Sequence, residues 1–148
     1  MHSDLAHWEQ AGWIRPVKQS RRQTQKLLAK AASDLTLAEG HTVNDDWAYI
    51  IAYSAALEAA QAALGICGYR PAREASHLRL IESLALTVGA DDLLVRRFRG
   101  LRRKRHRFLY DGEVDITGRD IEEMLKVARE VCGLVQEWIR VHHPELVD

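Results

Sequence analysis

The sequence predicts an all-α protein, an up-and-down bundle of four long helices with a short N-terminal helix. No stretch of the 148 residues alternates apolar and polar side chains with the period of two that marks a half-buried strand. Helix-starting and helix-ending residues are instead frequent, and the links between the segments they enclose are short. Long helices joined by short links favour a bundle in which neighbouring helices run antiparallel.

Capping residues and helix-ending glycines divide the chain into six helical segments. Ser20 stands where the second segment begins, Gly40 ends it, and Gly68 follows the third. Thr117 and Asp120 have the spacing of a capping box at the start of the last helix. The expected helices are 5–11, 20–39, 44–67, 76–88, 91–110 and 117–142.

Length and composition are those of a single domain, 1–148, in which we distinguish an N-terminal helix and arm at 1–16 from the bundle at 17–146. A hydrophobic share of 47% and a charged share of 28% exclude a disordered or fibrous chain. The acidic first residues lack the basic region of a secretory signal, and no apolar run approaches the about 20 residues of a membrane span. Cys67 and Cys132 stand in apolar helical contexts and predict buried free thiols. We therefore expect a cytoplasmic protein that makes no membrane contact.

Charge is unevenly distributed although the formal net charge is zero. Residues 1–110 hold 17 Lys and Arg against 11 Asp and Glu, whereas residues 111–148 hold 4 against 10. The stretch 96–107, RRFRGLRRKRHR, contains seven Arg and one Lys. A basic segment is thus followed by an acidic helix.

Three charged residues fall on faces that are otherwise apolar when the helices are read at 100° per residue. They are Asp34 in the second helix, Glu58 in the third and Arg105 in the fifth. An unpaired buried charge is costly, so we expect Arg105 to be buried and held by Asp34, Glu58 or both. This supporting cluster is either an ion pair that fixes the register of the helices or a device that orients Arg105 at the rim of a working groove.

The other face of the fifth helix carries Arg99, Arg103, His106 and Tyr110, with Arg102 alongside. No acid occurs between Asp92 and Asp111. Like charges at this density repel one another, so the face needs an anionic partner. The candidates are the protein's own acidic last helix, another subunit, or the phosphates of a nucleic acid, which Arg99, Arg102, Arg103 and His106 would bind.

At these residues the chain resembles the HEPN superfamily of nucleotide-binding domains, and in particular its small stand-alone prokaryotic members. The resemblance is carried by RRKRHRFLYDG at 102–112, AYIIAYSAALEAAQAALGICGYR at 48–70, LLAKAASDLTLAEG at 27–40 and VQEWIRVHHPEL at 135–146. It implies a helical bundle that forms a homodimer. Many superfamily members are metal-independent ribonucleases, including toxins paired with a minimal nucleotidyltransferase antitoxin.

The family motif, an Arg followed after four to six residues by His, has two alignments here. Arg99 and His106 fit with six residues between them. Arg105 and His106 fit a second frame in which Tyr110 takes the place of the motif His, and we favour this one. The reference pKa of Tyr is about 10, so it is a poor general base at neutral pH.

Three functions follow from the resemblance and the residues. The first is a dimeric module that binds nucleotide or RNA and partners a minimal nucleotidyltransferase in a toxin–antitoxin-like system. The second is a metal-independent endoribonuclease toxin, with Arg102, Arg105, His106 and Tyr110 as catalytic candidates; it uses no cofactor or metal. The third is a structural bundle whose basic face docks on its own acidic helix. His77 is expected to be a capping or surface residue, and the pair His142-His143 lacks the spacing of a metal site.

Overall fold

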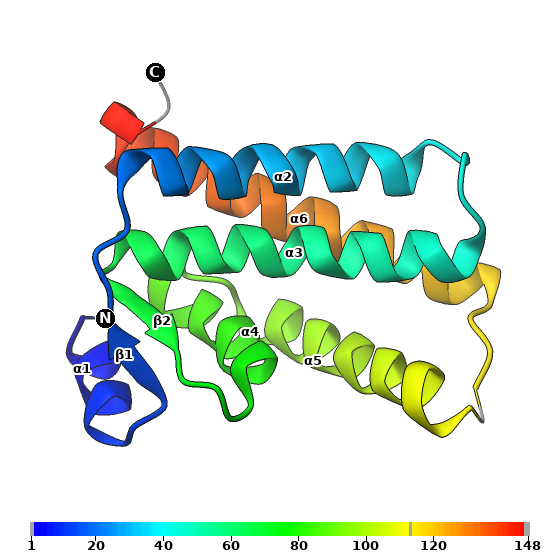
Figure 1. Ribbon diagram of the computed structural model, residues 1–148, viewed down its shortest axis with the longest axis horizontal. Coiled ribbons are helices and arrows are strands. Elements are labelled where there is room, and N and C mark those ends of the chain that lie inside the picture. The colour runs from blue at the N-terminus through cyan, green and yellow to red at the C-terminus, as the bar shows by residue number, and fades with distance from the viewer. Residues whose placement is uncertain (1, 113, 147–148) are drawn as a thin grey trace.

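The structure is a computed structural model that describes residues 2–112 and 114–146. Its helices follow the expected order, and two short strands that the sequence did not predict are added (Figure 1). The elements are α1 (His2–Gln10), β1 (Ile14–Pro16), α2 (Arg21–Glu39), α3 (Asp45–Ile66), β2 (Tyr69–Pro71), α4 (Ser76–Thr87), α5 (Asp92–His106), the π-helical turn η1 (Arg107–Asp111), α6 (Gly118–His142) and the 3₁₀ turn η2 (Pro144–Leu146).

The predicted starts of α2, α3, α5 and α6 are confirmed, and each is fixed by a local capping side chain. Helix α4 begins where predicted but without a side-chain cap, and α1 begins at His2, three residues earlier than predicted. Ser20 Oγ accepts a hydrogen bond from the amide of Gln23, whose side chain in turn accepts one from the amide of Ser20. Thr117 and Asp120 form the same reciprocal box at the start of α6. Such boxes satisfy amides that lack a partner in the first turn of a helix. The helix boundaries therefore depend on short-range chemistry that the sequence displays.

Helix α3 is the centre of the bundle, with α2 and α6 on one side and α4 and α5 on the other (Figure 1). Consecutive long helices run antiparallel, as expected for an up-and-down bundle. Small side chains let the neighbouring helices approach α3 closely. The alanine face of α3 is fully covered by the rest of the chain, through Ala52, Ala56, Ala59, Ala60 and Ala63.

Two tyrosines of α3 seat α5 on the core. Tyr49 donates a hydrogen bond of 2.7 Å from its hydroxyl to the carbonyl of Leu101. Tyr53 packs edge-on against Phe98, with ring centroids 5.7 Å apart. Both tyrosines and Phe98 are fully buried. These contacts fix the rotation of α5, and they therefore decide which of its arginines face inward.

A two-stranded antiparallel ribbon was not predicted from the sequence. Strands β1 and β2 pair Ile14 with Pro71 and Pro16 with Tyr69. Each has three residues, too few to display an alternating pattern. The ribbon joins the N-terminal arm to the link between α3 and α4 (Figure 1).

The apolar character of α3 reflects its place in the core. By length and composition α3 would suffice to cross a membrane, but most of its apolar stretch is buried inside the bundle. The central helix of a globular domain has this appearance. Both cysteines are free thiols, as the sequence predicts; Cys132 is buried as expected, whereas Cys67 is only half-buried.

Candidate functional site

The four catalytic candidates lie around one hollow of about 300 Å³, which we call the motif hollow. Helix α5 and the turn η1 supply one wall, and the start of α4 with the loop before it supplies the other. The lining residues are Arg73, Ala75, Ser76, His77, Arg102, Arg105, His106 and Tyr110. The motif hollow brings together the second alignment of the motif, Arg105-His106 with Tyr110, and leaves Arg99 outside.

The last turn of the basic helix is wider than the α-helix expected up to Tyr110. Residues 107–111 form a π-helical turn that ends at Gly112, whose amide donates to the carbonyl of Arg107 at 3.2 Å. Gly112 has a φ of +66°, a conformation that glycine adopts without strain. The turn leaves Tyr110 69% exposed with its ring centroid 4.8 Å from that of His106. Isolated π turns are frequent at functional sites.

Arg105 does not make the ion pair that the sequence analysis expects. It is half-buried, and the structure gives it no ion pair with Asp34 or Glu58. Its guanidinium carbon lies over the ring of Tyr53, 4.9 Å from the centroid, and its Nε has no hydrogen-bond partner among the described residues. Helical periodicity locates Arg105 on the inner face correctly, but it cannot say which residue of another helix meets it there.

Lys30, and not Arg105, forms the ion pairs with Asp34 and Glu58. From α2 its ammonium reaches Asp34 at 3.0 Å and Glu58 of α3 at 2.7 Å. Glu58 Oε1 is buried and has no hydrogen-bond partner in the part of the chain that the structure describes. Burial raises the pKa of Glu58 to about 6, against the lowering effect of Lys30. The i,i+4 spacing of Lys30 and Asp34 was the available sequence signal for this pair.

His77 lines the motif hollow, whereas the sequence predicts a capping or surface residue at this position. It is half-buried at the start of α4, where its Nδ1 shares a hydrogen bond of 3.2 Å with the hydroxyl of Tyr53. Burial lowers the pKa of His77, and the nearby cations Arg105 and Arg102 lower it further. The imidazole is therefore neutral at pH 7. Nothing in the sequence around His77 indicates this position, because the chain brings it to the motif through the link between α3 and α4.

The basic face of α5 borders a second hollow of about 380 Å³, the Arg99 hollow, which touches the motif hollow at Arg102. Arg99 itself is paired with Glu82 of α4 at 3.3 Å. Arg102 and Arg103 make no ion pair with any residue in 2–112 or 114–146. Of the expected phosphate-binding set, Arg99 is thus partly neutralised within the chain.

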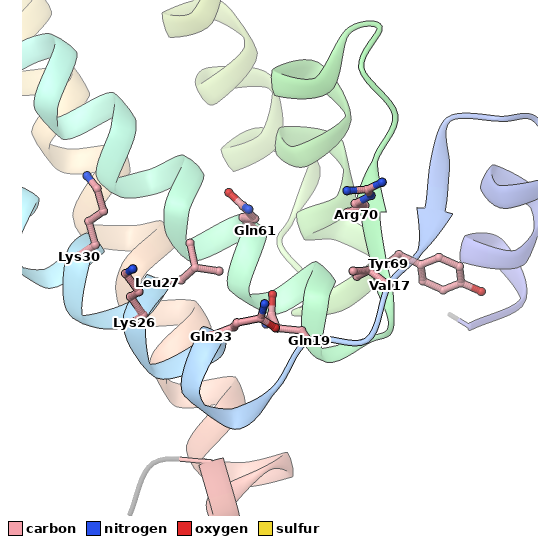
Figure 2. Close-up of a pocket in the computed structure, with 9 residues that line it drawn as sticks. All are labelled: Val17, Gln19, Gln23, Lys26, Leu27, Lys30, Gln61, Tyr69 and Arg70. Atoms are coloured by element: carbon pink, nitrogen blue, oxygen red, sulfur yellow. The ribbon is translucent and has the colours of Figure 1, made fainter.

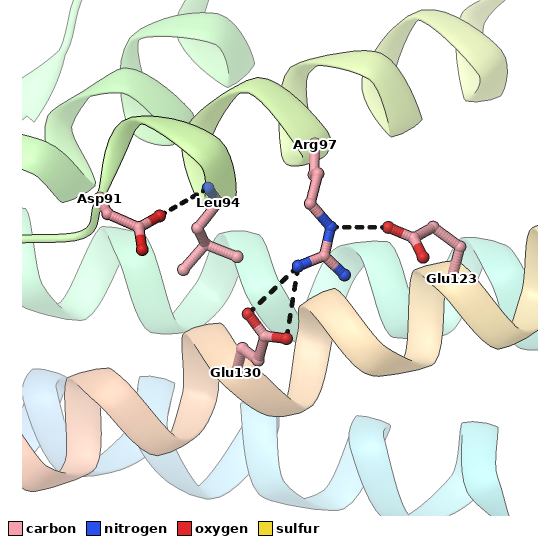
Figure 3. A network of polar contacts seen from close by, with 5 residues as sticks. All are labelled: Asp91, Leu94, Arg97, Glu123 and Glu130. Carbon is pink, nitrogen blue, oxygen red and sulfur yellow. Dashed lines mark hydrogen bonds and ion pairs between the residues drawn. The ribbon is translucent and has the colours of Figure 1, made fainter.

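The acidic last helix neutralises a different side of α5. Arg97 lies between two glutamates of α6, at 2.8 Å from Glu123 and 3.4 Å from Glu130 (Figure 3). Lys104 is paired with Asp120 at 3.2 Å. The acids of α6 therefore hold α5 in place through residues that do not line the motif hollow.

Two further hollows continue from the motif hollow across α3. The Glu58 hollow, about 480 Å³, shares Ser76, His77 and Arg105 with it. The Lys26 hollow, about 350 Å³, shares Gln61 and Arg70 with the Glu58 hollow. Figure 2 shows how α2, α3 and β2 together form its walls.

The four hollows adjoin one another through shared lining residues, and we call their combined lining the basic belt. Nine Lys and Arg side chains and two glutamates line the belt. His77 lines both the motif hollow and the Glu58 hollow, and His106 lines the motif hollow. The cations are Lys26, Lys30, Arg70, Arg73, Arg96, Arg99, Arg102, Arg103 and Arg105, and the acids are Glu58 and Glu82. Such a concentration of one charge attracts polyanions even when the net charge is zero. Within residues 2–112 and 114–146 there is no group of three side chains arranged to hold a metal ion.

The fold is an all-α bundle in which the motif lies at the end of α5, and the comparison with known families agrees with this helical architecture. The family model of the HEPN domain matches residues 24–138, and the chain belongs to this family. Neither a curated protein nor a solved structure matches the chain. Family membership supports a nucleotide- or RNA-directed function, without specifying a partner.

Proposed function

We propose that this HEPN protein binds single-stranded RNA along the basic belt. The observation that carries the proposal is that nine cations and only two glutamates line the four adjoining hollows. Three acids of α6, Asp120, Glu123 and Glu130, are engaged with Lys104 and Arg97. Arg102 and Arg103 make no ion pair with a described residue, which leaves them for an external anion. This division of the charges argues against a purely structural bundle in which the acidic helix neutralises the whole basic face.

The test is a titration of labelled single-stranded RNA with the wild type and with the double variant Arg102→Glu, Arg103→Glu. If about four phosphates are neutralised, log affinity should fall with log salt with a slope of about −3. The variant should bind more weakly and with a flatter slope. A matched control is Arg119→Glu, Lys126→Glu, which changes the charge equally at exposed positions that line none of the four hollows. Equal weakening by both variants would contradict the proposal.

A second candidate function is metal-independent cleavage of the bound RNA. Its support is the presence of two histidines, His77 and His106, around the hollow that Arg102 and Arg105 also line. Cleavage through the 2′-hydroxyl needs a base, an acid and a cation at the phosphate, and neutral His77 suits the first of these roles. Tyr110 would donate a hydrogen bond or stack on a base. Expression of the chain in a bacterial host should then arrest growth with loss of RNA, and His106→Ala should relieve the arrest.

The family resemblance extends the proposal to a homodimer that is paired with a minimal nucleotidyltransferase, in a toxin–antitoxin-like system. Two apolar side chains at the edge of the motif support a second protomer there, because Leu109 is 39% and Tyr110 is 69% exposed. Affinity capture of the tagged chain from its own host, with identification of the bound proteins, tests the pairing. Absence of any nucleotidyltransferase from the captured proteins would remove this partner.

A further inference from the structure

Two residues that line the Glu58 hollow each hold a buried polar atom without a partner among the described residues, one an acceptor and one a donor. Glu58 Oε1 and Arg105 Nε are the two buried side-chain polar atoms without a partner among the described residues. Both residues line this hollow, Glu58 from α3 and Arg105 from α5. Buried polar groups in native proteins are nearly always satisfied, so an unsatisfied pair in one cavity points to a ligand that supplies both a donor and an acceptor.

The other walls of the Glu58 hollow suit a flat ligand with a polar edge. Leu57, Leu80 and Pro71 provide apolar surface, and Tyr53 provides an aromatic one. Gln61, one turn beyond Glu58 on α3, adds an amide that both donates and accepts. The volume of about 480 Å³ lies in the range of small-ligand pockets, which combine apolar walls with a few placed polar groups.

The position of the hollow connects this ligand with the RNA proposed above. The Glu58 hollow adjoins the motif hollow along Ser76, His77 and Arg105. A strand whose phosphate lies at Arg102 would therefore have a neighbouring base within reach of Glu58. Proteins that recognise single-stranded RNA commonly take unstacked bases into pockets and bind their Watson–Crick edges.

We propose that the Glu58 hollow is a base-recognition pocket selective for guanine. The inference rests on the proposed RNA binding. A carboxylate only accepts hydrogen bonds, and guanine presents two adjacent donors, N1–H and the 2-amino group, on its Watson–Crick edge. Adenine and cytosine each place one amino donor beside a ring acceptor, and uracil has one N–H between two carbonyls. Guanine is therefore the base whose edge fits an ionised carboxylate.

The contacts of Glu58 leave it able to take this role. Lys30 binds Oε2 at 2.7 Å, which keeps Oε1 and its lone pairs for a ligand. The guanidinium of Arg105 offers Nε to an acceptor such as guanine O6, and its plane is a surface on which a base stacks. Glu58 is ionised at pH 7.5, above its raised pKa of about 6.

The experiment compares two single-stranded RNAs of the same length that differ only in one guanine or one inosine, at pH 7.5, with the full chain. Inosine lacks the 2-amino group and nothing else. We expect the wild type to bind the guanine strand about tenfold more tightly, the effect of one lost hydrogen bond to a charged group. Glu58→Gln should reduce this ratio to near one. The matched control Glu39→Gln, at a glutamate that pairs with Arg129 and lines none of the four hollows, should keep it.

The outcomes separate this proposal from the one on which it rests. Equal binding of the two strands by the wild type would overturn the guanine pocket and leave RNA binding intact. No binding of either strand would overturn both. A guanine preference that survives in Glu58→Gln would assign recognition to another part of the belt and refute the role of Glu58. The comparison of guanine with inosine needs no variant, so the test holds even if Glu58→Gln does not fold.

Discussion

The guanidinium carbon of Arg105 lies 4.9 Å from the centroid of the Tyr53 ring, and no carboxylate in 2–112 or 114–146 pairs with it. An inward-facing arginine at this site is thus held by an aromatic face. An arginine bound to a carboxylate has already spent its bidentate donors, whereas one that rests on a ring keeps its N–H groups for a phosphate or a base. The ring also has a fixed position, because Tyr53 is fully buried against Phe98.

We predict that Arg105→Ala lowers the free energy of unfolding by only about 1 to 2 kcal/mol, the range of a partly desolvated cation–π contact. A buried Arg–carboxylate pair would instead have cost about 3 to 5 kcal/mol. Denaturant unfolding at pH 7 measures the difference, with Arg105→Lys as the control that keeps a cation over Tyr53. A loss above 3 kcal/mol would indicate a carboxylate partner for Arg105.

The contrast between helix ends and side-chain partners shows what the sequence can predict. Ser20 and Thr117 mark helix starts correctly because a capping box involves residues three apart in the chain. The partner of Arg105 depends on how α5 is rotated against α3, which is fixed by Tyr49 and Tyr53, contacts that cross about 50 residues of sequence. Local sequence patterns therefore predict the helices but not the contacts between them.

Only part of the lining of the motif hollow could be predicted from the sequence. Arg102, Arg105, His106 and Tyr110 come from one helix and its last turn, so their proximity follows from their short spacing in the chain. His77 joins them from α4 and has no local signal. The alanine face of α3 is buried inside the chain, so a dimer interface would have to be formed by other residues.

Glu58 should make the free energy of unfolding increase as the pH falls. Its pKa is about 6 in the folded protein, above the ordinary value of 4.5, so the folded state binds the proton more tightly than the unfolded chain does. Between pH 7 and pH 5 the wild type should therefore gain about 1 to 2 kcal/mol relative to Glu58→Gln, as protonation relieves the buried charge. Urea unfolding of both proteins at the two pH values gives the difference. Parallel pH dependence would mean that Glu58 has an ordinary pKa.

His77 should act in the opposite direction. Because its pKa is lowered in the folded protein, the unfolded chain binds the proton more tightly below the ordinary value of 6.5. Stability that the wild type has at pH 7.5 should thus be lost as the pH falls through 6.5, and His77→Gln should lose less. An NMR titration of the ring resonances of His77 measures the pKa directly. A midpoint at or above 6.5 would contradict the buried position beside Arg102 and Arg105.

The homodimer is expected to involve the region around the π turn. Leu109 and Tyr110 are exposed beside the motif, and replacing Leu109 by Glu should place a charge in the interface and favour the monomer. Light scattering of the wild type at micromolar concentration should give about twice the chain mass of 16.8 kDa. The control Leu93→Glu alters another exposed leucine, at the far end of α5, and should leave the mass unchanged. A wild type that is strictly monomeric would remove the dimer.

Arg97 and Arg103 of α5 should respond differently to replacement by alanine. Arg97 is engaged by Glu123 and Glu130, whereas Arg103 is exposed and makes no ion pair in the described part of the chain. Arg103→Ala should therefore weaken binding of single-stranded RNA and reduce the salt slope by about 0.7, the contribution of one phosphate contact, with unchanged stability. Arg97→Ala should leave the slope as it is and lower the unfolding free energy, because two glutamates of α6 lose their partner. Titrations at several salt concentrations, with denaturant unfolding of the same samples, measure both quantities. The opposite pattern, with RNA affinity lost in Arg97→Ala and kept in Arg103→Ala, would mean that RNA displaces the acids of α6 and binds the other side of α5.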